Sequence, residues 1–483
     1  METQNSLMPS WLTKPTDLNS LNSKIWPESM VRGPEGEVSI GGVGVSALAA
    51  SFGTPLFVID EADFRSRATA VREIFESEAA AIGTSAKVYY AGKAFLSTGV
   101  VRWLDELGLN LDTASGGELA VALAGGINPS RIGLHGNNKS LFEIGRAVSA
   151  NLGAIVIDSE IEIERIASVA GAQDKIQPVR LRVNTGVHAH THDYLATARE
   201  DQKFGIALTD VAELVERIRS HSHLKFLGLH SHIGSQIFKV DGFLAAVERL
   251  VPLHAQLLKN GDVPELNLGG GFGINYTSAD DAPNLRAVVR EIMNAVSTAC
   301  HRLGIPVPTL AFEPGRVIAG PAGITLYNVG TIKDVLVGEE GATDSAVLAA
   351  SEGQVRKYVS IDGGMSDNLR AALYDADYSC SLVSRASQAG AALSRVVGKH
   401  CESGDIVVKA DYLPADVAPN DLLAVAATGA YCFSLSSNYN YLTKPGVVAV
   451  RDGEAKVLIR AETEVEMLQR DSGFTGSVAV EQK

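Results

Sequence analysis

The chain has 483 residues, a length that exceeds one typical hydrophobic core and predicts two domains. Its 56 acidic and 42 basic residues give a net charge of −14, which argues against nucleic acids and anionic membranes as partners. The four cysteines have neither a zinc-knuckle nor a CxxC spacing and are too few for a disulfide framework. This cysteine usage favours a reducing cytoplasm.

The N-terminal segment, residues 1–64, shows no signal-peptide pattern and little helical periodicity. Residues 41–59 carry no charge, but glycines and Pro55 interrupt them, so they do not resemble a membrane span. They predict a turn, a short helix and the start of a strand. We expect residues 1–64 to contribute to a β domain.

Short apolar runs then alternate with helical patterns such as GGELAVALAGG and LFEIGRAVSANLG. This alternation predicts βαβ units and a parallel sheet, and eight units of this size match a (β/α)8 TIM barrel over residues 65–320. The predicted strands are 88–90, 109–111, 132–134, 154–157, 179–183, 226–229, 265–268 and 310–312.

Polar or glycine-rich motifs follow almost all of these strands, beginning with AGKAF after the first. Because the carboxyl ends of barrel strands share one face, these motifs are expected to meet in one pocket. Lys93, in AGKAF, is a candidate Schiff-base lysine, a role that needs a partly buried, apolar site. The ordinary alternative for a single lysine is a position on a surface loop.

The motifs after the last two strands predict a phosphate site. In GGGFG, residues 269–273, glycines let backbone N–H groups approach a phosphate, and Arg316 of EPGR offers a second contact. Barrels often bind phosphate after strands 7 and 8. Glu313 of the same EPGR motif would keep a pyridine nitrogen protonated and make the ring an electron sink, unless it simply pairs with an arginine.

Two histidine motifs have different interpretations. HSHIGSQ places His230 and His232 two residues apart, so both side chains can share one face of a strand. HAHTH (His188, His190 and His192) resembles a metal site and leaves a metal-dependent barrel hydrolase as an alternative. Since no carboxylate cluster accompanies it at metal spacing, no metal is predicted.

After residue 320, strand-like runs recur without regular helices between them, which predicts a mostly antiparallel β domain over 321–483. Cys401 and Glu402 lie in CESGD, where the thiol is either a proton donor or an ordinary buried cysteine. Tyr431 would reach a phosphate or a substrate, or be a half-buried aromatic. The runs are 324–332, 357–362, 405–410, 422–426, 446–450 and 456–460.

Taken together, these motifs resemble those of the alanine-racemase-like enzymes that use pyridoxal 5′-phosphate, and among them the diaminopimelate decarboxylases. The resemblance extends from residue 53 to residue 440, and EDQKFG (200–205) is similar to actinobacterial members. One departure is Gly404, where many members have a serine. The motifs that carry the resemblance are YYAGKAF, LDTASGGEL, HGNNKS, HSHIGSQ, LNLGGGFGI, FEPGR, DGGMSDNLRAALY, CESGD and GAYCFSLSSNYN.

The resemblance implies decarboxylation of meso-2,6-diaminopimelate to L-lysine and CO2, the last step of lysine biosynthesis. It also implies a homodimer in which the partner subunit supplies Cys401 and Glu402 to a shared site. Cys401 would return a proton to the reacting carbon. The cofactor contacts it implies are Lys93, His232, Ser235, Gly271, Glu313, Arg316 and Tyr431, and the substrate contacts are Arg316, Arg370, Tyr374, Glu402 and Tyr431.

The distal groups of the substrate distinguish diaminopimelate decarboxylation from the alternative activities of this fold. Diaminopimelate carries a distal ammonium and a distal carboxylate, and Glu402 with Arg370 and Tyr374 offers the acid and base that both require. An ornithine- or arginine-type decarboxylase would need only the acid. Glu313 argues against a racemase, which prefers a weaker electron sink, and intact Lys93 and Cys401 argue against a non-catalytic cofactor-binding regulator.

Overall fold

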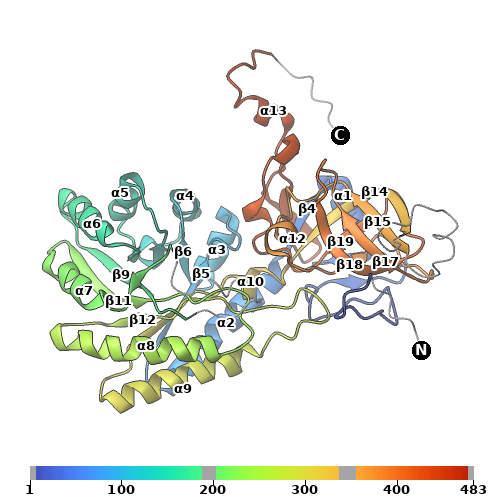
Figure 1. Cartoon of the computed structure of the whole chain (residues 1–483). Coiled ribbons are helices and arrows are strands. Elements are labelled where there is room, and N and C mark those ends of the chain that lie inside the picture. Colours follow the sequence, from blue (N-terminus) through green and yellow to red (C-terminus); the bar gives the residue numbers. More distant parts are fainter. Residues whose placement is uncertain (1–6, 188–202, 337–354, 477–483) are drawn as a thin grey trace, which may run out of the picture. The chain divides into compact units, whose positions relative to one another are not determined.

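The computed structural model describes residues 7–187, 203–336 and 355–476. It divides into two compact units, which Figure 1 shows in sequence colours. One unit comprises residues 1–64, 275–280 and 319–483, and the other comprises residues 65–274 and 281–318. Residues 275–280 lie inside the range predicted for the barrel but cluster with the first unit.

The second unit is a closed barrel of eight parallel strands, which confirms the predicted fold class. In spatial order β9, β11, β12, β13, β5, β6, β7 and β8 pair side by side, and β8 pairs with β9 to close the ring. The two-residue β10 (Ile206–Ala207) adds to β9. The strands are β5 (Ala86–Ala91), β6 (Asn110–Thr113), β7 (Ile132–Leu134), β8 (Ala154–Ile157), β9 (Gln177–Asn184), β11 (Leu224–His230), β12 (Glu265–Asn267) and β13 (Thr309–Phe312).

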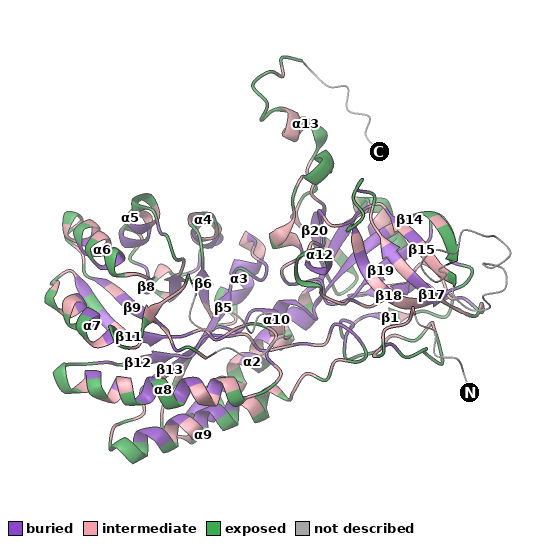
Figure 2. Ribbon diagram, viewed as in Figure 1, coloured by how far each residue is buried: buried purple, intermediate pink, exposed green. Residues whose placement is uncertain are grey.

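Helices surround the strands and turn their apolar sides inward, as the burial colours of Figure 2 show. Their starts are capped as the sequence dictates: the Ser115 hydroxyl accepts from the backbone at the start of α4, and Ser140 and Glu143 form a capping box on α5. The helices are α2 (Glu61–Ala81), α3 (Thr98–Glu106), α4 (Gly116–Gly125), α5 (Leu141–Ser149), α6 (Glu160–Ala172), α7 (Val211–Ser220), α8 (Asp241–Leu257), α9 (Leu285–Leu303) and α10 (Arg316–Ala319).

A buried ionic cluster crosses the barrel interior. Arg180 of β9 donates through Nε and Nη2 to one oxygen of Glu265 on β12, at 3.0 and 2.7 Å, and through Nη2 to the Tyr89 hydroxyl on β5 at 2.7 Å. These strands are not neighbours in the ring, so the side chains meet inside it. The interior is therefore a packed core that leaves the strand ends as the place for chemistry.

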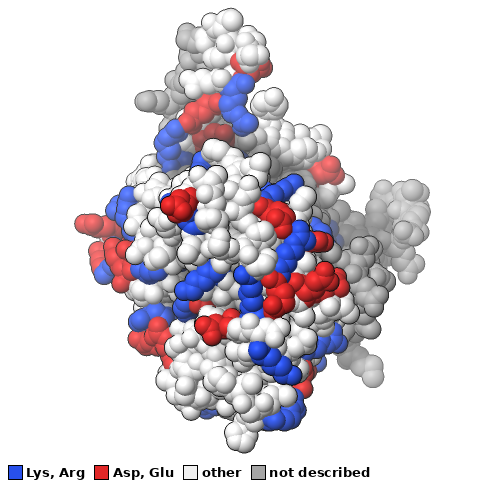
Figure 3. Space-filling model, turned by 90° about the vertical axis from the view of Figure 1, so that its left-hand side faces the viewer, with Lys and Arg blue, Asp and Glu red and all other residues white. Residues whose placement is uncertain are grey.

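Charges of both signs are interspersed on the face of the molecule that Figure 3 shows. On the barrel surface, Arg217 of α7 pairs with Glu160 and Glu164 of α6, and Arg302 of α9 pairs with Glu248 of α8. The charges of these helices thus pair with one another rather than accumulating with one sign. Among the described residues, no helix is both long and apolar enough to cross a membrane.

The first unit is built around a mixed, mostly antiparallel sheet of nine strands. Its main order is β18, β17, β15, β14, β4, β20 and β21, with β19 joining β14 to β16. The strands are β4 (Leu56–Asp60), β14 (Gly323–Leu336), β15 (Val355–Ile361), β16 (Cys380–Leu382), β17 (Ala391–Val397), β18 (Ile406–Pro414), β19 (Leu422–Val425), β20 (Gly446–Arg451) and β21 (Glu454–Ile459).

The N-terminal segment enters this sheet through β4, which lies between β14 and β20. Before it come a small antiparallel sheet of β1 (Val31–Arg32), β2 (Val38–Ile40) and β3 (Val43–Gly44), and then α1 (Val45–Phe52). The uncharged residues 41–59 therefore form a turn, β3, a short helix and most of a strand. The described part of this unit also contains two further short α-helices, α12 (Arg370–Tyr374) and α13 (Glu464–Leu468).

Candidate active site

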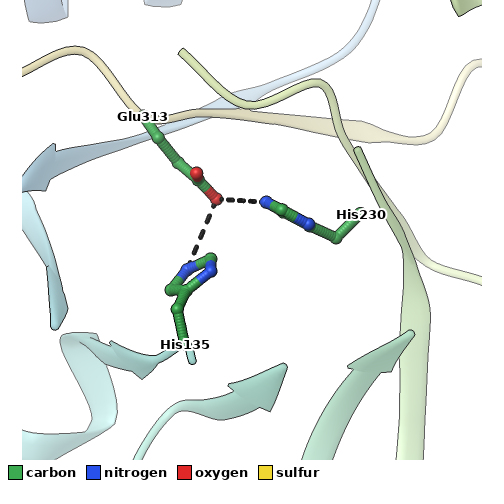
Figure 4. Close-up of side chains that lie close together, drawn as sticks. All are labelled: His135, His230 and Glu313. Atoms are coloured by element: carbon green, nitrogen blue, oxygen red, sulfur yellow. Dashed lines mark ion pairs between the residues drawn. The ribbon is translucent and has the colours of Figure 1, made fainter. Parts of the chain in front are cut away.

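A cluster of buried polar side chains lies at the carboxyl ends of the barrel strands, with Glu313 at its centre (Figure 4). Oε1 of Glu313 accepts a hydrogen bond from Nδ2 of Asn267 at 2.7 Å and lies 3.0 Å from Nε2 of His230 and 3.5 Å from Nε2 of His135. The same His135 nitrogen lies 3.1 Å from Oδ1 of Asp112. These groups come from the ends of five strands, so barrel closure alone brings them together.

The cluster favours one ionised carboxylate. Burial opposes the charge on Glu313, but His230 and His135 outweigh it and hold the pKa of Glu313 well below its ordinary value. Burial and the charge of Glu313 raise the pKa of Asp112 well above its ordinary value. Burial also lowers the pKa of His135 to about 4, against the opposing effect of Glu313. Glu313 is therefore the carboxyl group that stays ionised.

A second group of predicted residues forms a polar cradle. Nη2 of Arg316, at the start of α10, donates to the Ser235 hydroxyl at 2.7 Å. Gly271 has φ +107°, and a Cβ there would lie 2.3 Å from the carbonyl oxygen of Gly234. Only glycine permits so close a backbone approach. The structure thus brings Arg316 into contact with Ser235, and Gly271 belongs to the same unit of the chain.

Lys93 lies two residues after β5 and is exposed, whereas a partly buried position was expected for a Schiff-base lysine. His232 lies two residues after β11, where its Nδ1 accepts from the backbone N–H of Gly270 at 3.3 Å. Burial lowers the pKa of His232 well below its ordinary value, and the positive charge of Lys93 lowers it further. The amine and the imidazole therefore share one electrostatic environment at the mouth of the barrel.

Comparison with known proteins places this arrangement in a family. The family model of the pyridoxal-dependent decarboxylase, pyridoxal binding domain, matches residues 63–320. The chain is 49% identical to the diaminopimelate decarboxylase of Mycobacterium leprae over 97% of this chain and 96% of that one, and 40% identical to that of Bacillus subtilis over 92% and 97%. The chain belongs to the diaminopimelate decarboxylase family of pyridoxal-dependent decarboxylases.

Solved structures agree with this assignment. The diaminopimelate decarboxylase of M. jannaschii in complex with L-lysine is similar with a TM-score of 0.81 and 27% identity, over 92% of this chain and 98% of that one. That of Helicobacter pylori, also with L-lysine, gives a TM-score of 0.76 and 25% identity over 88% and 98%. The similarity covers both units of the chain.

The barrel residues fit the pyridoxal phosphate that this family takes as its cofactor. A phosphate needs N–H and O–H donors, which Arg316 and Ser235 offer as a pair, and a close backbone approach, which Gly271 permits. A pyridinium nitrogen needs an ionised carboxylate, and Glu313 has an oxygen, Oε2, that its contacts with Asn267 and the two histidines do not use. Lys93 presents an exposed amine for the covalent link.

Apart from Arg316, the predicted substrate residues lie in the unit that contains the nine-stranded sheet, called the β unit below. Arg370 begins α12 and is buried; its Nη1 donates to the Tyr378 hydroxyl at 2.5 Å, and its guanidinium lies over the Tyr276 ring at 4.8 Å. Tyr374 ends the same helix and is exposed. Arg370 is therefore fixed by aromatic neighbours, whereas Tyr374 is open to a ligand or partner.

Cys401 and Glu402 lie on an exposed loop whose shape depends on Asp405. The Asp405 carboxylate accepts from the backbone of Met365 at 2.6 Å and from both the backbone and Nδ1 of His400, at 2.8 and 2.9 Å. The Cys401 backbone in turn donates to Oδ1 of Asn440 at 3.3 Å. This anchoring holds the thiol and the carboxylate on one short, fixed turn.

Three smaller points concern the predicted motifs. A Cβ at Gly404 would meet open space, so the departure from serine there serves no steric need. Tyr431 is half-buried with φ +67°, a conformation that non-glycine residues adopt rarely. His188, His190 and His192 lie outside the described residues, so the role of HAHTH stays open.

The sequence had assigned no role to three members of the Glu313 cluster: His135, Asn267 and Asp112. Each lies at or just after the end of a barrel strand, in HGNNKS, ELNL and LDTASGGEL. That position was the available signal. The sequence also did not indicate that His135, His230 and Glu313 would bring one nitrogen or oxygen atom each within 4.8 Å of one another.

Proposed function

We propose that the chain decarboxylates meso-2,6-diaminopimelate to L-lysine and CO2, the last step of lysine biosynthesis. The observation that carries the proposal is the 49% identity to the M. leprae diaminopimelate decarboxylase along nearly the whole chain. The aligned region includes the barrel residues that fit the cofactor and the residues of the β unit that would bind the distal groups of the substrate. The M. jannaschii relative was solved with L-lysine, the product of this reaction.

Each barrel residue then has a role toward pyridoxal phosphate. Lys93 would hold the cofactor covalently, and Ser235, Gly271 and Arg316 would bind its phosphate, with Tyr431 nearby. His232 would stack on the ring. When bound, the cofactor accepts the electron pair that the departing carboxylate leaves behind. Glu313 supports this chemistry because an ionised carboxylate keeps the ring nitrogen protonated.

The β-unit residues select the substrate and complete the reaction. Arg370 would bind the distal carboxylate through its planar guanidinium, and Glu402 would bind the distal ammonium, with Tyr374 and Arg316 as further contacts. As the bond to the carboxylate breaks and CO2 leaves, Cys401 gives its thiol proton to the same carbon. The exposed thiolate then recovers a proton from solvent.

A homodimer would supply Cys401 and Glu402 to the site of the partner subunit. Exposed aromatic side chains beside the Cys401 loop support this proposal: Tyr439 stacks on His400 and is 42% exposed, and Tyr441 is 78% exposed. Large exposed apolar groups of this kind mark protein–protein contacts. Because Cys401 must remain a free thiol to act, we place the enzyme in the reducing cytoplasm.

The direct test is lysine formation from meso-diaminopimelate with added pyridoxal phosphate, with ornithine and arginine as parallel substrates. We expect lysine from diaminopimelate alone, loss of activity in Lys93→Ala and Cys401→Ala, and normal activity in Lys259→Ala, which removes an exposed lysine elsewhere on the barrel. Product from ornithine or arginine instead would overturn the roles of Arg370 and Glu402. No product from any of them would favour a cofactor-binding regulator.

A mixing experiment tests the shared site. If the partner subunit provides Cys401, equal amounts of inactive Lys93→Ala and Cys401→Ala chains form mixed dimers with one intact site. Random mixing then restores about a quarter of the wild-type activity. No recovery after verified subunit exchange would mean that one chain supplies both residues.

A further inference from the structure

The contacts of Glu313 are distributed unevenly over its two oxygens. Asn267, His230 and His135 all approach Oε1, at 2.7, 3.0 and 3.5 Å. None of these three contacts uses Oε2. A carboxylate held by one oxygen has a fixed plane, and its other oxygen keeps its full capacity to accept a hydrogen bond.

We propose that His135 and His230 are positioning residues that hold Glu313 by Oε1 and so reserve Oε2 for the protonated nitrogen of the cofactor ring. The inference rests on the proposed function only in taking pyridoxal phosphate as the cofactor. It assigns a role to two histidines that do not themselves need to touch cofactor or substrate.

The two imidazoles are themselves held in place. Figure 4 shows them approaching the same carboxylate oxygen from different strands of the barrel. Their rings pack edge to face with centroids 5.0 Å apart, and His230 is 1% exposed. Asp112 fixes His135 from a third direction, 3.1 Å from its Nε2. Rotation of either ring would therefore break packing as well as the contact with Glu313.

Their chemistry also suits the task. Burial lowers the pKa of both His135 and His230, against the opposing effect of the Glu313 charge. Both Nε2 atoms lie beside Oε1, where the two imidazoles stabilise the negative charge of the carboxylate. The charged and titratable groups that act electrostatically on Glu313, His135 or His230 include Asp112, Glu118, His232, Lys93, Lys139, Arg180 and Arg182.

Removing either histidine should weaken the electron sink in a predictable direction. Because His230 and His135 hold the pKa of Glu313 low, the carboxylate becomes more basic without one of them. The proton shared with the ring nitrogen then moves toward the carboxylate, and the ring changes from pyridinium toward neutral pyridine. The ring accepts electrons less readily in that state.

The test uses enzyme reconstituted with ¹⁵N-labelled pyridoxal phosphate, without substrate. In His230→Leu and His135→Leu, we expect the ring-nitrogen ¹⁵N chemical shift to move from the pyridinium toward the pyridine range. For diaminopimelate, kcat should fall about 10- to 100-fold, the scale expected for the loss of a polar contact to a charged group, while KM changes little. His230→Gln, which keeps a side-chain N–H, should lie between wild type and His230→Leu.

The matched control is His254→Gln on α8, a buried histidine outside the Glu313 cluster, which should leave the ¹⁵N shift unchanged. A pyridinium shift that persists in folded, cofactor-loaded His135→Leu and His230→Leu would overturn the proposal. So would one equivalent of zinc in the cofactor-free wild type that both variants lose, since the trio would then be a metal site. Because no substrate is present, failure of diaminopimelate turnover leaves this result unaffected.

Discussion

Removing the hydroxyl of Tyr378 tests whether Arg370 is held in place for the substrate. The hydroxyl accepts from Nη1 of Arg370 at 2.5 Å, and both groups are buried. Such a bond to a charged group is worth about 1.5–3 kcal/mol, or roughly a 10- to 150-fold change in an equilibrium constant. Phenylalanine keeps the ring that packs near the guanidinium, so Tyr378→Phe removes only this hydrogen bond and the weaker 3.6 Å contact of the hydroxyl with Sγ of Cys432.

Steady-state lysine formation from diaminopimelate provides the assay. Because a distal contact binds substrate and transition state alike, the loss in kcat/KM should appear mainly as a higher KM. Tyr412→Phe, which removes a hydroxyl that contacts Met8, is the matched control and should change neither constant. If Tyr378 acts through Arg370, adding Tyr378→Phe to Arg370→Ala costs nothing further. Multiplied losses in the double variant would refute the reasoning.

Three further predictions concern cofactor binding and stability. Gly271→Ala should raise the dissociation constant of pyridoxal phosphate about tenfold or more, because alanine is strained at this φ and its Cβ meets a carbonyl; absorbance titration against Gly145→Ala, whose Cβ meets open space, checks this. Glu265→Ala should lower the free energy of unfolding by about 3–5 kcal/mol by leaving a buried guanidinium without its carboxylate, whereas Glu164→Ala, at an exposed pair, should change it little in the same urea titration. Burial lowers the pKa of His254 to about 4, so between pH 6.5 and pH 4 the unfolded chain binds more protons than the folded chain. The free energy of unfolding therefore decreases as the pH is lowered, by about 3 kcal/mol from this group. His254→Gln should make the free energy of unfolding depend less on pH in this range.

The barrel was predictable because its strands are buried on both faces and therefore appear as continuous apolar runs. β8, for example, is AIVI with every residue buried. The β unit was harder to predict. β16 was missed because CSL is only three residues long, and β17 because serine and arginine interrupt the apolar residues of AALSRVV. Pairing of β16 with β19, and of β17 with β15 and β18, decides their conformation more than propensity does.

Site residues that belong to a motif with a known chemical role could be predicted from the sequence. Residues that join the site only because the fold brings them close in space could not. Lys93 and Glu313 belong to strand-end motifs with recognisable roles. The contact of His135 with Glu313 depends on barrel closure, which brings the ends of β7 and β13 together across the ring. Asn267 was hidden for another reason: it lies inside an apolar run that predicts only a strand.

The separation of roles between the two units has a consequence of its own. Glu313 and its histidines would set the charge of the cofactor ring from the barrel, whereas Arg370 would select the substrate from the β unit. Arg370→Ala should therefore raise KM for diaminopimelate at least about tenfold through the loss of a charge-assisted contact. It should leave both the dissociation constant of pyridoxal phosphate and the ¹⁵N shift of its ring nitrogen unchanged. A ¹⁵N shift that moves in Arg370→Ala would mean that substrate recognition and ring protonation are coupled, because a residue that only selects the substrate has no effect on the cofactor in its absence.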